Sequence, residues 1–211
     1  MVLGGLMKNI FFLIFIFSVT LIATPMKKLQ NGENKIFNLI NEKYKVDSKE
    51  DRVRIEKIQK TLDSLIAYDT IAKNVLKGKN TKTKKKHWDS ITDAQKKEFK
   101  ALYKELIEKV WINQLEKVNK KEGKIEKNYK VEYKDEKIRG DVAMVYTVVT
   151  AKDEVTQVDF RFYKEKIVDF IIDERSTVRR YRRTFSRHIN KNGFDSLLKK
   201  MRKRLDELNK K

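Results

Sequence analysis

Cysteine is absent from this 211-residue sequence. The chain therefore forms no disulfide, offers no thiolate to a metal ion and has no thiol nucleophile. It also lacks the residue through which a bacterial lipoprotein is attached to lipid. Proline occurs once and glycine seven times. So few helix and strand breakers argue against a long disordered tail and favour long regular elements.

The residue types that carry catalysis or bind metal are also scarce. The two histidines, His87 and His188, show no metal-ligand spacing to a partner. The scattered glycines form no phosphate-binding loop, and no serine lies in a nucleophile-elbow pattern. Asp169 and Asp173 are paired carboxylates on one predicted strand, but an ion pair with Arg161 explains them more simply than acid–base catalysis. The sequence indicates no active site and no cofactor.

The first 26 residues differ from the rest. Lys8 precedes an uncharged, largely apolar stretch over residues 9–26, the pattern of a secretory signal peptide, and Met7 is an alternative start. The stretch approaches the roughly 20 residues that a membrane-spanning helix needs, so an uncleaved anchor is the alternative. We expect residues 1–26 to be a signal peptide or N-terminal membrane anchor, and residues 27–211 to form a single exported domain.

Positive charge is in large excess, with a formal net charge of +20. A surplus of this size favours an anionic partner, which is a nucleic acid, a phospholipid surface or an acidic protein. Export makes nucleic acid the least favoured of the three. The cations are concentrated in runs within residues 82–86, 179–187 and 199–204. Such runs also occur as ordinary solvated helix faces.

Apolar residues in the first half recur every three to four positions, which predicts amphipathic helices. The first covers residues 33–44, and the second begins after Ser48 as N-cap. Thr92 and Gln95 form a capping box that opens a long helix ending near Asn119. The apolar face of this helix is wide enough to contact a sheet together with either a second helix or a ligand.

From Tyr129 the apolar period changes to two, which predicts strands. Four strands are expected, over residues 129–134, 142–151, 157–162 and 167–172, with Val168, Phe170 and Ile172 sharing one face. The short connections make neighbouring strands antiparallel. Two helices close the chain. The expected fold is α+β, with helices packed on one side of a four-stranded antiparallel meander sheet.

Three local stretches carry a family resemblance. They are residues 67–76, Trp88 with the helix start at residues 91–99, and residues 168–195 with their Tyr-Arg-Arg-Thr-Phe and Gly-Phe-Asp strings. In this order and spacing they resemble the MlaC family of periplasmic phospholipid-binding proteins, also called the toluene-tolerance auxiliary family. The resemblance covers roughly Lys49 to Leu208. The hairpin at Glu165-Lys166 departs from it, because the family often has Gly-Gly-Trp there.

The resemblance implies an apolar cavity between sheet and helices that holds acyl chains, with the phosphate head group at its mouth. Family members carry phospholipid between an outer-membrane lipoprotein complex and an inner-membrane ABC transporter that bears an MCE ring, a system that maintains outer-membrane lipid asymmetry. We therefore expect a periplasmic, non-enzymatic and monomeric phospholipid carrier that meets membrane surfaces and binds no nucleic acid.

Positions within the predicted elements suggest which side chains line this cavity. The lipid-binding candidates are apolar residues of the long helix, the last two strands and the helix after them: Leu102, Leu106, Val110, Phe160, Phe162, Phe170, Ile172, Tyr181 and Phe185. The head-group candidates are Arg175 and Arg179. Ordinary core or surface positions are the alternative for each. Two other functions stay open: a basic binding module for an acidic protein or nucleic acid, with no lipid cavity, and a small hydrolase that uses Asp169 and Asp173.

Overall fold

The computed structural model describes residues 23–42, 48–119, 129–151 and 154–210, except for the side chains of residues 111 and 113–119. The described helices are α1 (Pro25–Asn41), α2 (Lys49–Leu65), α3 (Tyr68–Val75), the short 3-10 helix η1 (His87–Ser90), α4 (Asp93–Asn119), α5 (Thr177–Asn192) and α6 (Phe194–Asn209). The strands are β1 (Tyr129–Arg139), β2 (Val142–Ala151), β3 (Glu154–Tyr163), β4 (Lys166–Ile172) and β5 (Arg175–Ser176).

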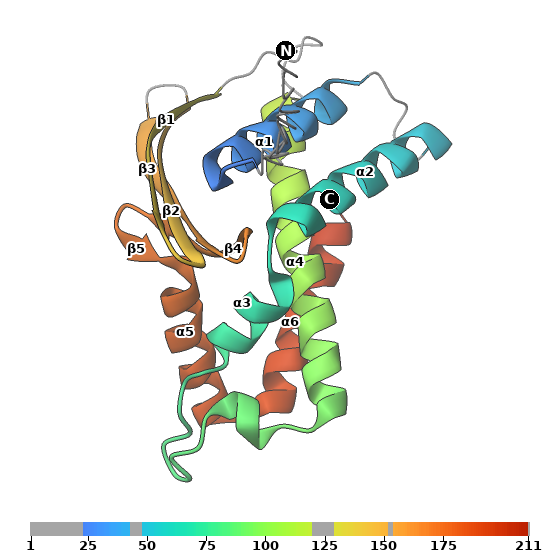
Figure 1. Ribbon diagram of the computed structural model, residues 1–211. Coiled ribbons are helices and arrows are strands. Elements are labelled where there is room, and N and C mark those ends of the chain that lie inside the picture. The colour runs from blue at the N-terminus through green and yellow to red at the C-terminus, as the bar shows by residue number, and fades with distance from the viewer. Residues whose placement is uncertain (1–22, 43–47, 120–128, 152–153, 211) are drawn as a thin grey trace, which may run out of the picture.

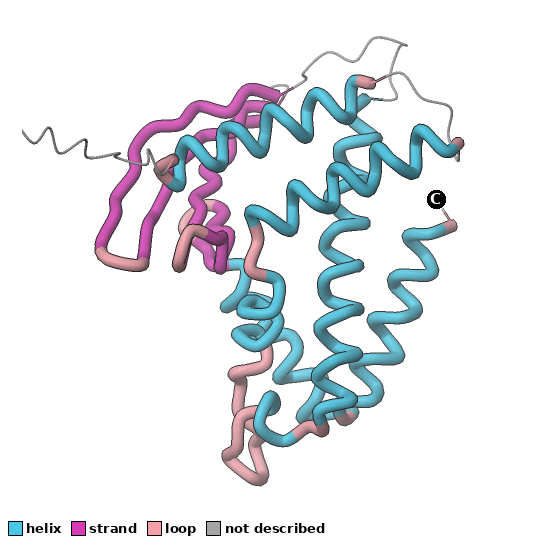
Figure 2. Tube along the Cα trace, turned by 45° about the vertical axis from the view of Figure 1, so that its right-hand side comes forward, coloured by secondary structure: helices cyan, strands magenta, loops and turns pink. Residues whose placement is uncertain are grey.

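The strands form one antiparallel sheet in the order β1-β2-β3-β4-β5. Helix α1 lies across one face of this sheet, and α4 and α6 stand side by side (Figure 1). Helix α5 leads away from the β5 end of the sheet, and α1 and α2 run alongside each other (Figure 2). The predicted α+β class with an antiparallel sheet is confirmed.

The sheet has five strands, so the predicted number of four is wrong. The additional strand, β5, pairs Arg175 with Ile172 and Ser176 with Ile171. It follows a tight turn in which Asp173 and Glu174 have φ of 45° and 63°. Two consecutive left-handed residues suit the right-handed twist of a two-residue hairpin. A strand of two residues is too short to show an alternating pattern, so periodicity could not reveal it.

The pairing of β3 with β4 contains a shift that changes which side chains face the core. Arg161 pairs with Asp169, whereas Phe162 pairs with Ile167, which leaves Val168 as an additional residue in β4. Such a bulge re-aims the side chains before it. Ile167 is therefore the buried residue, at 2% exposure, and Val168 is only half-buried. The additional residue interrupts the simple alternation along β4, so the expectation that Val168 shares a face with Phe170 and Ile172 stays a prediction.

The helix starts follow from local side-chain chemistry. The Ser48 hydroxyl accepts a hydrogen bond from the Asp51 amide at 3.2 Å. Thr92 and Gln95 exchange the two reciprocal bonds of the predicted capping box, at 3.2 Å and 3.0 Å. Helix α1 begins earlier than predicted, at Pro25, because Thr24 caps it and a proline suits the first helical turn.

The predicted signal peptide or anchor over residues 1–26 lies mostly outside the described residues. Its last two positions, Pro25 and Met26, belong to α1. Within the part of the chain that the structure describes, no helix combines the length and the apolar character that crossing a bilayer requires.

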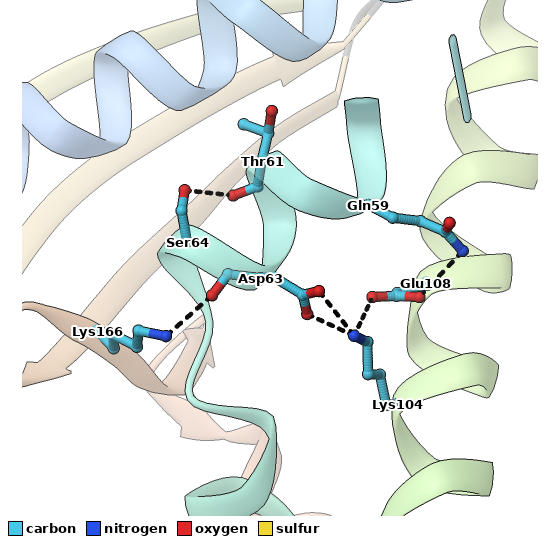
Figure 3. A network of polar contacts seen from close by, with 7 residues as sticks. All are labelled: Gln59, Thr61, Asp63, Ser64, Lys104, Glu108 and Lys166. Carbon is cyan, nitrogen blue, oxygen red and sulfur yellow. Dashed lines mark hydrogen bonds and ion pairs between the residues drawn. The ribbon is translucent and has the colours of Figure 1, made fainter. Parts of the chain in front are cut away.

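The hydrophobic core collects side chains from every α-helix and from β2, β3 and β4. Its most completely buried large side chains include Ile71, Leu76, Phe99, Val145 and Phe162. A polar network links α2 to α4 beside this core (Figure 3). In it the Lys104 Nζ lies 2.6 Å from Asp63 Oδ1 and 3.7 Å from Glu108 Oε1.

Candidate functional site

A pocket of about 540 Å³ lies where α3, α4, β4, α5 and α6 approach one another. Its wall is mainly aliphatic and aromatic, with cationic side chains among the rest. The lining residues are Ile71, Tyr103, Leu106, Ile107, Val110, Phe170, Ile172, Thr177, Val178, Arg180, Tyr181, Phe185, Leu197, Lys200, Met201 and Arg204. A mostly apolar pocket of this size with a few polar groups is what a small-molecule or lipid site requires.

Asp169 positions the start of α5 at this pocket. Its buried carboxylate accepts hydrogen bonds from the Ser176 hydroxyl at 2.6 Å and from the Val178 amide at 3.0 Å. Ser176 in turn caps α5 by accepting a bond from the Arg179 amide at 3.0 Å. Negative charge at a helix N-terminus is favourable because it meets unsatisfied amides and the positive end of the helix dipole. Asp169 therefore ties α5 to β4.

This role bears on the paired carboxylates of the sequence. Arg161 lies opposite Asp169 in the sheet register, but the bonds of Asp169 go to Ser176 and Val178, so the predicted ion pair is replaced by a helix cap. Asp173 sits in the turn after β4 and accepts a bond from the Gln157 amide at 3.3 Å. Both carboxylates thus have structural partners in the backbone.

Aromatic rings build one wall of the pocket. Phe185 packs edge-on against Tyr103, with ring centroids 6.4 Å apart, and lies 5.6 Å from Tyr181. Phe99 extends this cluster into the core, 5.9 Å from Phe185. Burial raises the pKa of the Tyr103 hydroxyl above its ordinary range, which keeps that group uncharged near neutral pH. The wall therefore presents large apolar area without a charge in the interior.

The charged side chains that line the pocket are all cations. Arg180, Lys200 and Arg204 are all solvent-exposed. The Arg180 guanidinium lies 5.6 Å from the ring centroid of Tyr181, and Arg204 Nη1 lies 3.1 Å from Glu207 Oε2. Long cationic side chains can follow an apolar wall with their stems and keep the charge in water. An anionic group bound at this edge would meet positive charge.

The structure brings together six of the nine predicted lipid-binding residues. Leu106, Val110, Phe170, Ile172, Tyr181 and Phe185 line the pocket. The remaining three do not. Phe162 is only 1% exposed in the core, Phe160 packs 5.8 Å from Phe170, and Leu102 packs against the core cluster. That the six lining residues contact acyl chains stays a prediction.

The predicted head-group residues, Arg175 and Arg179, do not line the pocket, whereas Arg180, Lys200 and Arg204 do. A signal for the latter two was available in the sequence. Leu197, Lys200, Met201 and Arg204 recur at spacings of three and four, which places them along one stripe of a helix. The prediction assigned the apolar residues of this stripe to the core and did not consider the two cations, Lys200 and Arg204, that share the stripe.

Neither histidine joins a metal-binding group. His87 is buried, its Nε2 lies 2.9 Å from the Ser186 hydroxyl, and burial lowers its pKa. His188 Nε2 lies 3.2 Å from the Ser196 hydroxyl. Across the described ranges, no three side chains of histidine, cysteine, aspartate or glutamate gather where they could hold a metal ion.

Comparison with known proteins adds to this geometry. A solved structure with the same fold is the phospholipid-binding protein from Ralstonia solanacearum, determined in complex with a phospholipid. The TM-score is 0.65 at 18% sequence identity, and the match covers 89% of this chain and 99% of that one. At this identity the likeness establishes the fold alone. None of the curated proteins matches the sequence.

The family described as MlaC protein matches residues 30–203. This range takes in all the described strands and the helices that line the pocket, apart from the last turns of α6. The chain is therefore a member of the MlaC protein family.

Proposed function

We propose that this chain is a phospholipid carrier whose pocket among α4, β4, α5 and α6 holds acyl chains. One observation carries the proposal: a mainly apolar pocket of about 540 Å³ has three solvent-exposed cations, Arg180, Lys200 and Arg204, in its lining. This arrangement matches an amphiphile with apolar chains and an anionic phosphate. Membership of the MlaC family supports it, as does the phospholipid bound to the Ralstonia solanacearum protein.

A lipid carrier needs shielding rather than catalysis. Burying an acyl chain of about 15 methylenes stabilises it by roughly 12 kcal/mol relative to water, at about 0.8 kcal/mol for each methylene. Relative to a bilayer, which is equally apolar, the gain is close to zero. A protein pocket can therefore take a lipid from one membrane and release it to another without an energy source of its own.

We propose that the exchange takes place in the periplasm. The family supports a shuttle between an outer-membrane lipoprotein complex and an inner-membrane ABC transporter with an MCE ring. Residues 1–26 would direct export, as a cleaved signal peptide or as an anchor. The bound phospholipid is cargo and not a cofactor, and the carrier performs no chemical step. Asp169 and Asp173 fit this proposal because both bind backbone amides.

The test is native mass spectrometry with lipid extraction on the full chain, purified from exporting cells without added lipid. We expect phospholipid at close to one molecule per chain. A chain that carries no lipid and takes up none from added phospholipid would contradict the proposal, and its apolar pocket would then be a packing defect.

A matched pair of variants on α4 tests the pocket itself. Leu106→Trp places a larger ring in the pocket, whereas Leu102→Trp makes the same change one helical turn earlier, at a half-buried position outside the pocket. We expect Leu106→Trp to lose most of its bound phospholipid and Leu102→Trp to retain it, with both circular-dichroism spectra unchanged. Equal retention by the two variants would move the lipid site elsewhere.

A further inference from the structure

A second hollow, of about 720 Å³, lies along α5 beside Gly78 and is strongly basic. Its lining consists of Gly78, Arg180, Arg182, Arg183, Thr184, Ser186, Arg187 and Asn190. No acidic side chain is among these residues. Arg180, Arg183 and Arg187 are solvent-exposed, while Arg182 is half-buried and donates through Nε to the Asn74 carbonyl at 2.9 Å.

A lysine-rich hairpin, residues 77–87, is fastened to α5 at this hollow. The Asn190 side chain accepts a bond from the Thr81 amide at 3.1 Å, and His87 contacts Ser186. At Gly78 the approach is so close that an added Cβ would lie 2.8 Å from Ser186. The hairpin and α5 therefore form one surface, which we call the basic face.

The basic face carries many charges that form no ion pair with the described residues. Residues 77–87 contain six lysines, and residues 177–192 contain five arginines and one lysine, with no aspartate or glutamate in either range. Within the described residues, none of these cations takes part in an ion pair, whereas Arg202 on α6 pairs with Glu98. Unpaired cations on one face attract an anionic partner over a distance set by ionic screening.

The basic face is continuous with the apolar pocket. Arg180 lines both hollows. Two exposed apolar side chains lie beside it at the pocket, Tyr181 at 37% exposure and Ile172 at 38%. Tyrosine with neighbouring cations is the combination that settles at a membrane–water interface, where the ring meets apolar chains and the charge meets phosphates.

We propose that the basic face docks on an anionic phospholipid bilayer and turns the mouth of the apolar pocket toward the membrane. Its purpose, lipid exchange, rests on the proposed carrier function. The cations are spread over a helix and a hairpin, and most of their side chains are solvent-exposed. This arrangement suits a field of laterally mobile head groups better than a single acidic peptide, which requires fixed geometry.

Vesicle flotation with the full chain tests the docking. The wild-type protein should bind vesicles of phosphatidylglycerol and phosphatidylcholine and should not bind vesicles of phosphatidylcholine alone. Arg183→Gln together with Arg187→Gln should weaken binding about 25-fold, at about fivefold for each cation near an anionic surface. The control removes the same charge from exposed positions of α2, by Arg52→Gln with Lys60→Gln, and should weaken binding less than fivefold.

Three results would overturn the docking surface. Equal losses in the two double variants would mean that total charge, and not the basic face, governs binding. No binding of the wild-type protein to either vesicle would mean that the face has no membrane partner. Binding to polyglutamate without binding to the vesicles would assign the face to an acidic protein.

The orientation can be read independently because the chain has no cysteine. Thr184→Cys places a single thiol on the basic face, and Val53→Cys places one on α2 at a position that is 42% exposed. An environment-sensitive fluorophore should shift to the blue at residue 184 on adding phosphatidylglycerol vesicles and stay unchanged at residue 53. Equal shifts, or a shift at residue 53 alone, would overturn the orientation.

Lipid content is measured on the same samples by native mass spectrometry, so the two proposals fail separately. A wild-type chain that docks through the basic face but carries no phospholipid refutes the carrier function and leaves the docking surface standing. A chain that carries phospholipid but does not bind the vesicles refutes the docking surface and leaves the carrier function standing.

Discussion

Two regions of this molecule are rich in charge and use it in opposite ways. Between α2 and α4, Lys104 lies between Asp63 and Glu108, and Gln59 donates to Glu108 at 3.3 Å (Figure 3). On the basic face, the cations of α5 and the 77–87 hairpin take part in no ion pair with the residues that the structure describes. Charge paired across a helix contact holds the fold together, whereas unpaired charge on one face is available to a partner.

The largest effect on stability should come from breaking the paired region. Lys104→Met keeps the length of the side chain but leaves the buried carboxylate of Glu108 without its cation. An uncompensated buried charge is costly, so the free energy of unfolding should fall by about 2 kcal/mol. Thermal unfolding should detect this as a decrease in Tm of about 4–8 °C. An unchanged Tm would show that the network contributes nothing to the stability of the fold.

A smaller effect is expected at the start of α5, the helix that carries the basic face. Ser176→Ala removes the cap of the Arg179 amide and one partner of Asp169. Loss of a serine N-cap costs about 1 kcal/mol, which chemical denaturation can resolve. Thr184→Ala, in the middle of the same helix, is the matched control. If the two variants unfold at the same denaturant concentration, the cap contributes nothing to stability.

The pH dependence of stability offers a finer test of the paired region. Burial is the main cause that raises the pKa of Glu108 above its ordinary value, partly opposed by Lys104. For Lys104, hydrogen bonding to Asp63 and the charge of Glu108 outweigh burial and raise the pKa. The carboxylates of Asp63 and Glu108 thus favour the charged form of Lys104, while burial disfavours the charged form of Glu108.

The sign of the effect follows from proton binding. With a folded pKa above the unfolded one, the native state binds more protons, so the contribution of Glu108 is complete at acid pH and is lost as pH rises through the folded pKa. Glu108→Gln should remove this loss, so its stability relative to the wild-type protein should increase as the pH rises above the ordinary glutamate pKa of about 4.3. Denaturant titrations at a series of pH values measure this. A constant difference would mean that Glu108 has the same pKa in both states.

The smallest effect on stability should come from the basic face. Arg183→Met removes an exposed cation without an ion pair, so the free energy of unfolding should change by less than about 0.5 kcal/mol. Calorimetry of Lys104→Met and Arg183→Met side by side completes the comparison. A large destabilisation by Arg183→Met would assign a structural role to the basic face.

Local chemistry made much of the fold predictable. Ser48 and Thr92 mark helix starts because their side chains satisfy amides a few residues ahead, an interaction that needs no tertiary partner. The change of apolar period at Tyr129 marks the start of the sheet because the alternation of a strand can also be recognised within a few residues. The short strand β5 and the additional residue Val168 were not predicted, because each depends on how a neighbouring strand pairs.

The site was predictable only in part. Leu102, Leu106 and Val110 form one ridge of α4, and sequence spacing treats them alike. Leu106 and Val110 line the pocket and Leu102 does not, although Leu102 and Leu106 both pack against the core cluster. An apolar side chain that lines a pocket has the same composition and spacing as one in a packed core, so neither property separates the two.

By itself the sequence determined the helices and strands with local caps or clear periodicity, the α+β class, the family and the excess of positive charge. These depend on residue order and composition, which act over a few positions or over the whole chain. Only the tertiary structure decided which apolar residues surround a pocket, that Asp169 caps α5, and which cations lack a counter-charge. Those properties depend on contacts between segments as distant as Asn74 and Arg182, whose approach no local pattern encodes.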